Sequence, residues 1–166
     1  MDSLNNFTYR TFNGTDCRFF VNSIRNIYTK HQGMEQVFWK GFQQNHQLKE
    51  AIVHFKNVFF SVPHPIRSVK HVANPLAGSA AKRINLFLRW MVRNDSNGVD
   101  FGIWQQLPMS ALMIPLDLHS GNTARKLGLL HRKQNDWKAV EELTANLRDF
   151  DPADPDDTYA KLFSTS

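Results

Sequence analysis

The sequence is poor in cysteine, with the single residue Cys17 among 166. One thiol cannot form a disulfide within the chain or supply the several thiolates of a zinc or iron–sulfur site. Long apolar runs are also missing, since none approaches the ~18 residues that span a bilayer. The first residues carry neither the basic start nor the apolar stretch of a signal peptide. These absences predict a cytoplasmic protein that has no contact with a membrane.

Patterns for metal and nucleotide binding are missing as well. The histidines between His31 and His71 lie at least seven residues apart, whereas zinc sites commonly use closely spaced pairs. No segment has the G-x-x-x-x-G-K form of a phosphate-binding loop or the G-x-S-x-G form of a nucleophile elbow. We therefore expect neither a metal nor a cofactor.

Helical periodicity dominates what is present. No stretch alternates between apolar and polar residues over the length of a strand, whereas apolar residues recur three and four apart along much of the chain. The pattern predicts one all-α domain over residues 1–166, with a loop over 61–79. The expected helices are one capped by Thr15, a short one after Gly33, and others over 48–59, about 80–93, 117–126, and onward from Asp136 and from Asp154.

Charge is distributed unevenly along this chain, whose net charge is +5. Residues 61–135 contain ten basic and three acidic side chains, whereas residues 136–166 contain three basic and eight acidic ones. A basic centre followed by an acidic end is typical of a polyanion-binding face beside a solvated segment. Solvated helix faces give the same distribution, so charge alone leaves nucleic-acid binding open.

Small residues lead into a lysine in the segment Leu76–Arg83, which reads L-A-G-S-A-A-K-R. We expect a tight hairpin followed by a helix whose free N–H groups and positive dipole end suit a phosphate. Lys82 would lie in the first helical turn, where the dipole and Arg83 favour the neutral amine that attacks carbon. The alternatives are an ordinary glycine-containing loop before a core helix and a merely exposed lysine.

A carboxylate follows 35 residues after this lysine, in the segment Ile114–His119, which reads I-P-L-D-L-H. The proline-led turn places Asp117 at the N-terminus of a helix, where free N–H groups keep a carboxylate ionised. Such a carboxylate can stabilise a sugar cation or orient a water molecule. The alternative is a helix cap that contributes about 1 kcal/mol, and the two roles are compatible.

The two segments together resemble motifs of the helix-hairpin-helix superfamily of base-excision DNA glycosylases. That family carries an L-P-G-[VI]-G-x-K hairpin, onto which Leu76, Gly78 and Lys82 fall. It also carries a V-D-x-H segment with an essential aspartate, which Asp117 matches. The departures from the hairpin are Ala77, Ser79 and Ala80, which replace its proline, its aliphatic residue and its second glycine.

Over most of its length the chain is similar to a bacterial family of proteins of unknown function, which is distantly related to these glycosylases. The similarity is strongest in residues 82–93, 98–104 and 132–140. Members of that family begin many residues earlier, which leaves open that the domain is N-terminally incomplete. An incomplete domain would have apolar faces for a missing segment or another chain to cover.

The resemblance implies a protein of DNA base-excision repair. It would bind double-stranded DNA and act as a glycosylase and AP lyase, cleaving the N-glycosidic bond of a damaged base with Lys82 and Asp117 as catalytic residues. Phe101, Trp104 and Trp90 are candidates for stacking on an extruded base. A DNA-binding module without catalysis and a purely structural helical fragment are the alternatives. The residues expected to contact DNA are Gly78, Ser79, Ala80, Arg83, Arg125 and Lys126.

Overall fold

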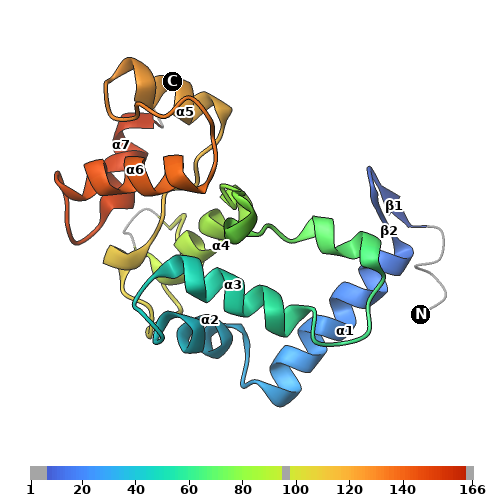
Figure 1. Cartoon of the computed structure of the whole chain (residues 1–166). Coiled ribbons are helices and arrows are strands. Elements are labelled where there is room, and N and C mark those ends of the chain that lie inside the picture. The colour runs from blue at the N-terminus through green and yellow to red at the C-terminus, as the bar shows by residue number, and fades with distance from the viewer. Residues whose placement is uncertain (1–6, 95–97, 164–166) are drawn as a thin grey trace.

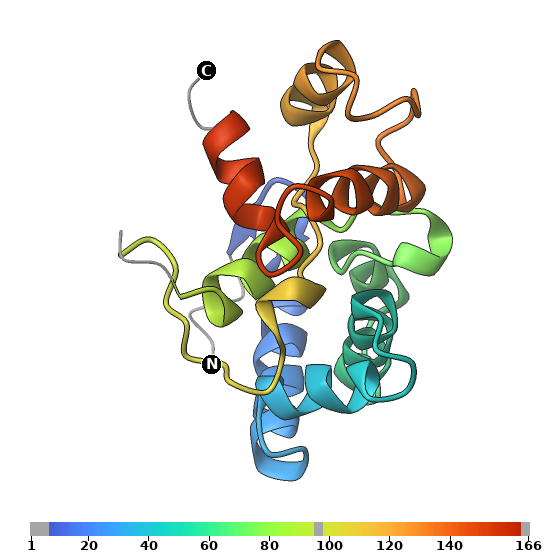
Figure 2. The same cartoon turned by 90° about the vertical axis from the view of Figure 1, so that its left-hand side faces the viewer.

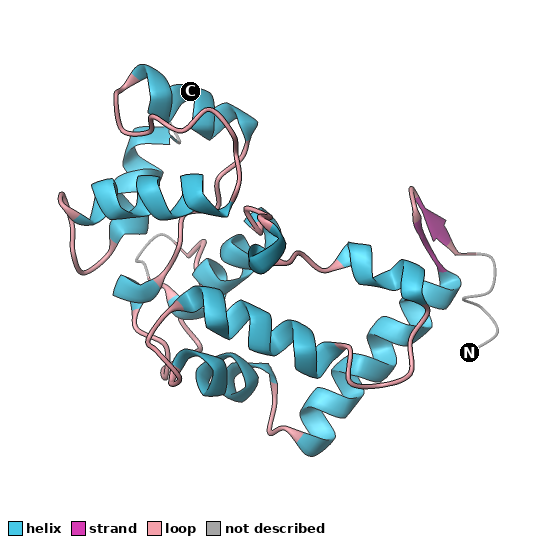
Figure 3. Ribbon diagram, in the orientation of Figure 1, coloured by secondary structure: helices cyan, strands magenta, loops and turns pink. Residues whose placement is uncertain are grey.

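The computed structural model describes residues 7–94 and 98–163, which are mostly helical (Figures 1 and 3). Strands β1 (Thr8–Tyr9) and β2 (Phe12–Asn13) form a short antiparallel hairpin. The all-α prediction is therefore confirmed apart from this hairpin. No helix in the described part of the chain has the length and apolarity that crossing a membrane requires. The α-helices are α1 (Gly14–Lys30), α2 (Met34–Phe42), α3 (Leu48–Phe59), α4 (Lys82–Val92), α5 (Leu118–Lys126), α6 (Trp137–Arg148) and α7 (Pro155–Phe163).

The start of α1 differs from the prediction, because its N-cap is Asn13 and not Thr15. The Asn13 side chain accepts a hydrogen bond from the Asp16 amide at 3.2 Å, and the Asp16 carboxylate accepts one from the Asn13 amide at 3.0 Å. This reciprocal pair satisfies two N–H groups at once. Thr15 could not form it, since the residue three positions later is Arg18 and carries no acceptor.

The predicted loop over 61–79 contains two 3₁₀-helices, η2 (Ile66–His71) and η3 (Pro75–Ala77), so the loop prediction is wrong there. A third, η4 (Met109–Ala111), follows Pro108. Such short turns carry no long apolar periodicity, which explains why the sequence pattern misses them. The Lys56 ammonium of α3 donates to the Val72 carbonyl at 2.6 Å and so fixes the end of η2 against α3.

The buried core runs through two groups of helices and the helix between them. Figure 1 shows α1, α2 and α3 on one side, α5, α6 and α7 on the other, and α4 between them. Helices α2 and α3 can approach closely because Gly41 has no Cβ. A Cβ at this position would lie only 2.7 Å from the Ala51 Cα. Across this contact the rings of Phe38 and Phe55 stack at 4.6 Å. The buried Leu88 of α4 and Trp137 of α6 continue the same core.

Buried ion pairs fasten α7 to the C-terminal half of α4, beside which it lies in Figure 2. The Arg93 side chain is 7% exposed and makes three contacts of 2.8 Å with carboxylates. Arg89 lies 3.3 Å from Asp156, which is fully buried. A buried guanidinium needs several acceptors to offset its lost hydration. The carboxylates around Arg93 are Asp100, Asp154 and Asp157.

Burial raises the pKa of Asp156 from 3.8 to about 6, more than the positive charge of Arg89 lowers it. The folded state therefore binds this proton more tightly than the unfolded chain. The contribution of Asp156 to stability is greatest below about pH 4 and is lost as the pH rises through about 6.

We expect the substitution Asp156→Asn to change stability in a pH-dependent manner. The variant has no proton to lose, so its unfolding free energy should rise relative to wild type by on the order of 2 kcal/mol between pH 4 and 7. Urea denaturation of both proteins at the two pH values measures this difference. The exposed Asp149→Asn serves as the control for the loss of a carboxylate. A gap between Asp156→Asn and wild type that does not change with pH would contradict the titration.

Candidate active site

The structure brings together the two residues that the sequence singles out for catalysis. Lys82 is the first residue of α4 and Asp117 is the N-cap of α5, as predicted. The Lys82 Nζ donates to the Asp117 Oδ2 at 2.6 Å. The two side chains are 46% and 36% exposed, so they meet at the surface and within reach of a large ligand.

Positive φ angles direct the chain into α4. Gly78 has φ +84°, and a Cβ there would meet no atom within 4 Å. Glycine is therefore favoured at this position by its backbone conformation and not by lack of space. Ala81 has φ +48° and is the N-cap of α4, which has no side-chain cap. An uncapped helix N-terminus presents unpaired N–H groups. At α4 these groups belong to the turn that contains Lys82 and Arg83, both of which are exposed.

The turn before α4 already satisfies some of its own backbone N–H donors. The Gly78 amide donates to the Pro75 carbonyl at 3.0 Å, and the Ser79 amide donates to the Asn74 carbonyl at 3.2 Å. The half-buried Ala80 follows them. A phosphate at this hairpin would therefore meet the start of α4 and the Arg83 side chain before it meets the amides of Gly78 and Ser79.

Asp117 is held by a reciprocal cap with Ser120. The Asp117 Oδ1 accepts from the Ser120 amide at 2.8 Å and from its hydroxyl at 2.9 Å, while that hydroxyl accepts from the Asp117 amide at 3.0 Å. Burial raises the pKa of Asp117, but the hydrogen bonds from Lys82 and Ser120 outweigh it and lower the pKa to about 2. The carboxylate is therefore ionised at neutral pH.

The start of α6 connects the hairpin to the Asp117 turn. The Trp137 amide donates to the Gly78 carbonyl at 3.0 Å, and the Asn135 side chain donates to the Asp117 carbonyl at 3.0 Å. Gly121 makes room for this contact, since a Cβ there would lie 2.7 Å from the Asn135 Oδ1. Residues 135–137 therefore fix the distance between the starts of α4 and α5.

The two cations predicted at the end of α5 differ in their surroundings. The Arg125 guanidinium donates to the Arg132 carbonyl at 2.8 Å and to the Asn135 side chain at 2.5 Å. Arg125 therefore supports the segment that holds Asp117. Lys126 is exposed to solvent and can reach an external phosphate.

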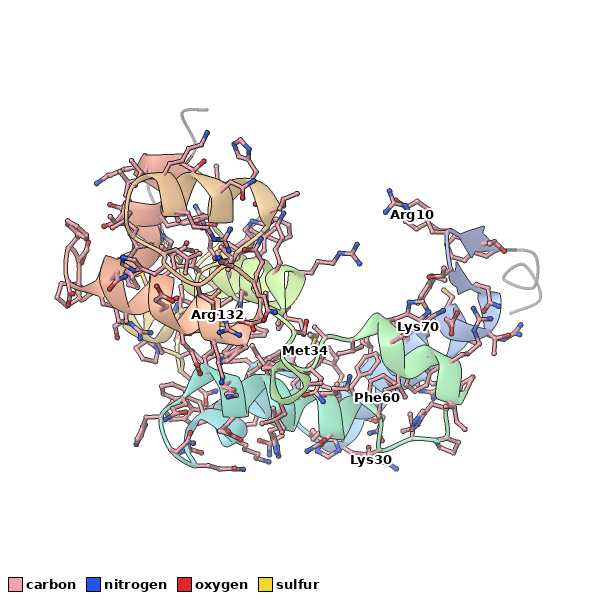
Figure 4. All side chains as sticks on the ribbon, turned by 45° about the horizontal axis from the view of Figure 1, so that its top comes forward. Arg10, Lys30, Met34, Phe60, Lys70 and Arg132 are labelled. Atoms are coloured by element: carbon pink, nitrogen blue, oxygen red, sulfur yellow. The ribbon has the colours of Figure 1, made fainter. Side chains whose placement is uncertain are left out.

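A pocket of about 500 Å³ opens between α1, α2, α3, η2 and α4, and Lys82 is part of its wall. Met34 and Lys70, two further wall residues, are labelled in Figure 4. Its volume is in the range of ~300–1,000 Å³ that is typical of small-molecule sites. In the described residues no His, Cys, Asp and Glu side chains form a group that could hold a metal ion. The aromatic residues of the pocket are Phe20, Phe38, Phe55, Phe59 and Phe87.

These phenylalanines are not the aromatic residues that the sequence suggests for base stacking. Trp104 packs in the core, with ring centroids 5.7 Å from Phe38 and 5.4 Å from Phe87. Phe101 and Trp90 are exposed and lie outside the pocket wall. Helical spacing marks the pocket phenylalanines only as core residues, because a cavity between helices leaves no pattern in the sequence.

We expect two variants of Asp117 to distinguish the contribution of the helix cap to stability from that of the ion pair. Asp117→Ala removes the cap and should lower the unfolding free energy by about 1 kcal/mol. Asp117→Asn retains a good N-cap and loses only an exposed ion pair, so its loss should be smaller. Urea denaturation at neutral pH measures both values. Equal losses in the two variants would show that the contact with Lys82, and not the cap, stabilises this turn.

Comparison with known proteins places the chain in a family without assigning an activity. Residues 1–159 match the family described as "Protein of unknown function (DUF2400)". No curated protein and no solved structure matches the chain. The arrangement of Lys82, Asp117 and the pocket therefore has to be interpreted from its own chemistry.

Proposed function

The chain belongs to the DUF2400 family of proteins of unknown function, and we propose that it is a DNA-binding protein of base-excision repair, a glycosylase and AP lyase. The observation that carries this proposal is the 2.6 Å contact between Lys82 and Asp117 beside an aromatic pocket. An amine, an ionised carboxylate and an apolar pocket are the groups needed to receive a base and displace it from its sugar.

Binding to duplex DNA would use cations of the pocket wall and of the end of α5. Arg83 and Lys126 are exposed, and Lys70 and Arg83 line the pocket with Lys82. Together with the free N–H groups of α4, they suit the phosphates on either side of an extruded nucleotide. In this proposal η3, the turn at Gly78 and α4 act as the helix-hairpin-helix-like element.

The proposed reaction begins when a damaged base enters the pocket. As the bond from C1′ to the base nitrogen breaks, Lys82 gives a proton to the departing base and its amine nitrogen forms a bond to C1′. The base leaves with the electron pair of the broken bond and with that proton. The ionised Asp117 stabilises the positive charge that develops at C1′. Ring opening moves a proton from the Lys82 nitrogen to the sugar O4′ and gives a Schiff base on Lys82. Loss of a proton from C2′ to solvent then breaks the 3′ C–O bond by β-elimination, and the 3′ phosphate leaves with the electron pair of that bond.

Trapping with borohydride tests the covalent step. We expect a duplex with an abasic site to become cross-linked to the wild-type protein, because reduction makes the Schiff base permanent. Lys82→Ala and Lys82→Arg should both abolish the cross-link, although Lys82→Arg retains the positive charge. Lys40→Ala, which removes an exposed lysine of α2 outside the pocket wall, is the matched control and should still be trapped. Denaturing gels of labelled DNA measure the outcome.

The same experiment distinguishes the alternative functions. Salt-sensitive retention of DNA without any cross-link would favour the non-catalytic module. If DNA is not retained even at low salt, the result would favour the purely structural helical fragment. A cross-link that persists in Lys82→Ala would overturn the assignment of Lys82 as the nucleophile.

Salt dependence tests the proposed phosphate contacts. Each phosphate neutralised by a cation contributes about 0.9 to the slope of log K against log salt. We therefore expect Arg83→Gln and Lys126→Gln each to reduce the slope by roughly one unit. Lys40→Gln, an exposed position on α2, should leave it unchanged. Fluorescence anisotropy over a salt series gives these slopes, and unchanged slopes in the first two variants would exclude those contacts.

A further inference from the structure

The pocket contains one histidine among side chains that chiefly donate hydrogen bonds. Its polar wall residues are Lys70, His71, Ser79, Lys82 and Arg83. Lysine and arginine have no acceptor, and the Ser79 hydroxyl already accepts a bond from the Ala81 amide at 3.2 Å. The side chains of this wall therefore offer a bound base many hydrogen-bond donors. The imidazole of His71 supplies the side-chain acceptor.

Asp16 lies beside one nitrogen of His71. The His71 Nε2 is buried without a hydrogen-bond partner and lies 3.4 Å from the Asp16 Oδ2. Because a carboxylate accepts and cannot donate, it favours, of the two neutral tautomers, the one with the proton on Nε2. The Nδ1 lone pair is then the group that remains for a bound molecule.

The carboxylate is itself fixed and ionised. Asp16 is fully buried, and the Ser68 hydroxyl donates to its Oδ1 at 2.6 Å. Burial raises the pKa of Asp16, but the hydrogen bonds from Ser68 and Asn13 outweigh it and keep the pKa below 3.8. The positive charge of Arg67, 3.5 Å away, acts in the same direction.

Aromatic neighbours fix the plane of the imidazole. The His71 ring packs edge-on against Phe12 at 5.1 Å and against Phe20 at 6.4 Å between centroids. Its side chain is only 13% exposed. A ring held on two sides, with one nitrogen beside a carboxylate, presents its other nitrogen in a defined direction, as selective recognition requires.

We infer that His71 is a specificity-determining residue of the pocket, whose Nδ1 accepts a hydrogen bond from an N–H group on the edge of an extruded base. The inference rests on the proposed function, because it takes the pocket as the site of that base. It names the substrate class as bases that carry an amino or imide N–H at the edge away from the sugar. A base without that hydrogen would leave Nδ1 unpaired in a desolvated site.

Matched bases in one duplex test the inference. Each duplex carries one unpaired nucleotide, which is adenine or unsubstituted purine in one pair and thymine or N3-methylthymine in the other. We expect wild type to bind the N–H member of at least one pair about tenfold more tightly, the value of one hydrogen bond. His71→Phe keeps an aromatic ring and should bring that ratio to about one. Fluorescence anisotropy at about pH 8 measures the affinities, and His119→Phe, exposed on α5, is the control.

The outcomes separate this inference from the proposed function. Loss of discrimination in His71→Phe, with trapping of abasic DNA retained, supports the inference. Discrimination that survives in His71→Phe, or none in wild type, overturns the role of His71 while trapping still supports the glycosylase. A wild-type protein that neither retains nor traps DNA overturns both.

A measurement on wild type removes the dependence on a variant that could misfold. Long-range ¹H–¹⁵N correlation of the free protein should show His71 protonated at Nε2 and unprotonated at Nδ1. Addition of the favoured duplex should shift the Nδ1 resonance, whereas its partner without the N–H should not. A proton on Nδ1 in the free protein, or equal shifts with both duplexes, would overturn the inference.

Discussion

The hydrogen bonds made by residues 135–137 are the constraint on which the candidate site depends. The Trp137 amide binds the Gly78 carbonyl, and the Asn135 side chain binds the Asp117 carbonyl. Because the Trp137 ring is fully buried in the core, this short segment has a fixed position. Lys82 and Asp117 lie 35 residues apart in the chain. Residues 135–137 nevertheless anchor both of them, through the Gly78 carbonyl four residues before Lys82 and through the carbonyl of Asp117 itself. Their contact therefore follows from the placement of α6.

Helix α4 links this site to the rest of the molecule. Its first residue, Lys82, belongs to the ion pair and to the pocket wall. Arg89 in its C-terminal half and Arg93 at its C-cap bind the α7 carboxylates of Asp156 and Asp157. Buried charges of this kind add little net stability and are costly when one partner is lost. The ion pairs define how α7 docks against α4. The apolar face of α4, which includes the fully buried Leu88, supplies the burial that stabilises the helix.

The exposed ion pair itself contributes little to stability. A contact between half-exposed Lys82 and Asp117 side chains is expected to contribute only about 0–1 kcal/mol, while Asp117 already caps α5 through Ser120. The fold thus retains its helix starts without this contact. The pocket next to it is lined by core phenylalanines and by His71, whose Nε2 lies 3.4 Å from Asp16 of the α1 capping box. Residues with structural roles therefore also line the pocket.

The sequence by itself determined the helices with long apolar stripes, including 48–59 and the helix that follows Asp136, because burial of a periodic face is a local pattern. It also determined that Lys82 and Asp117 begin helices, since a small-residue turn and a proline-led aspartate act over a few residues. The 3₁₀-helix η2 and the pocket with His71 were decided by the tertiary structure, whereas the Asn13 cap rests on a local pairing with Asp16 three residues later. A cavity wall, and a carboxylate 3.4 Å from an imidazole 55 residues away, arise only when several helices pack together.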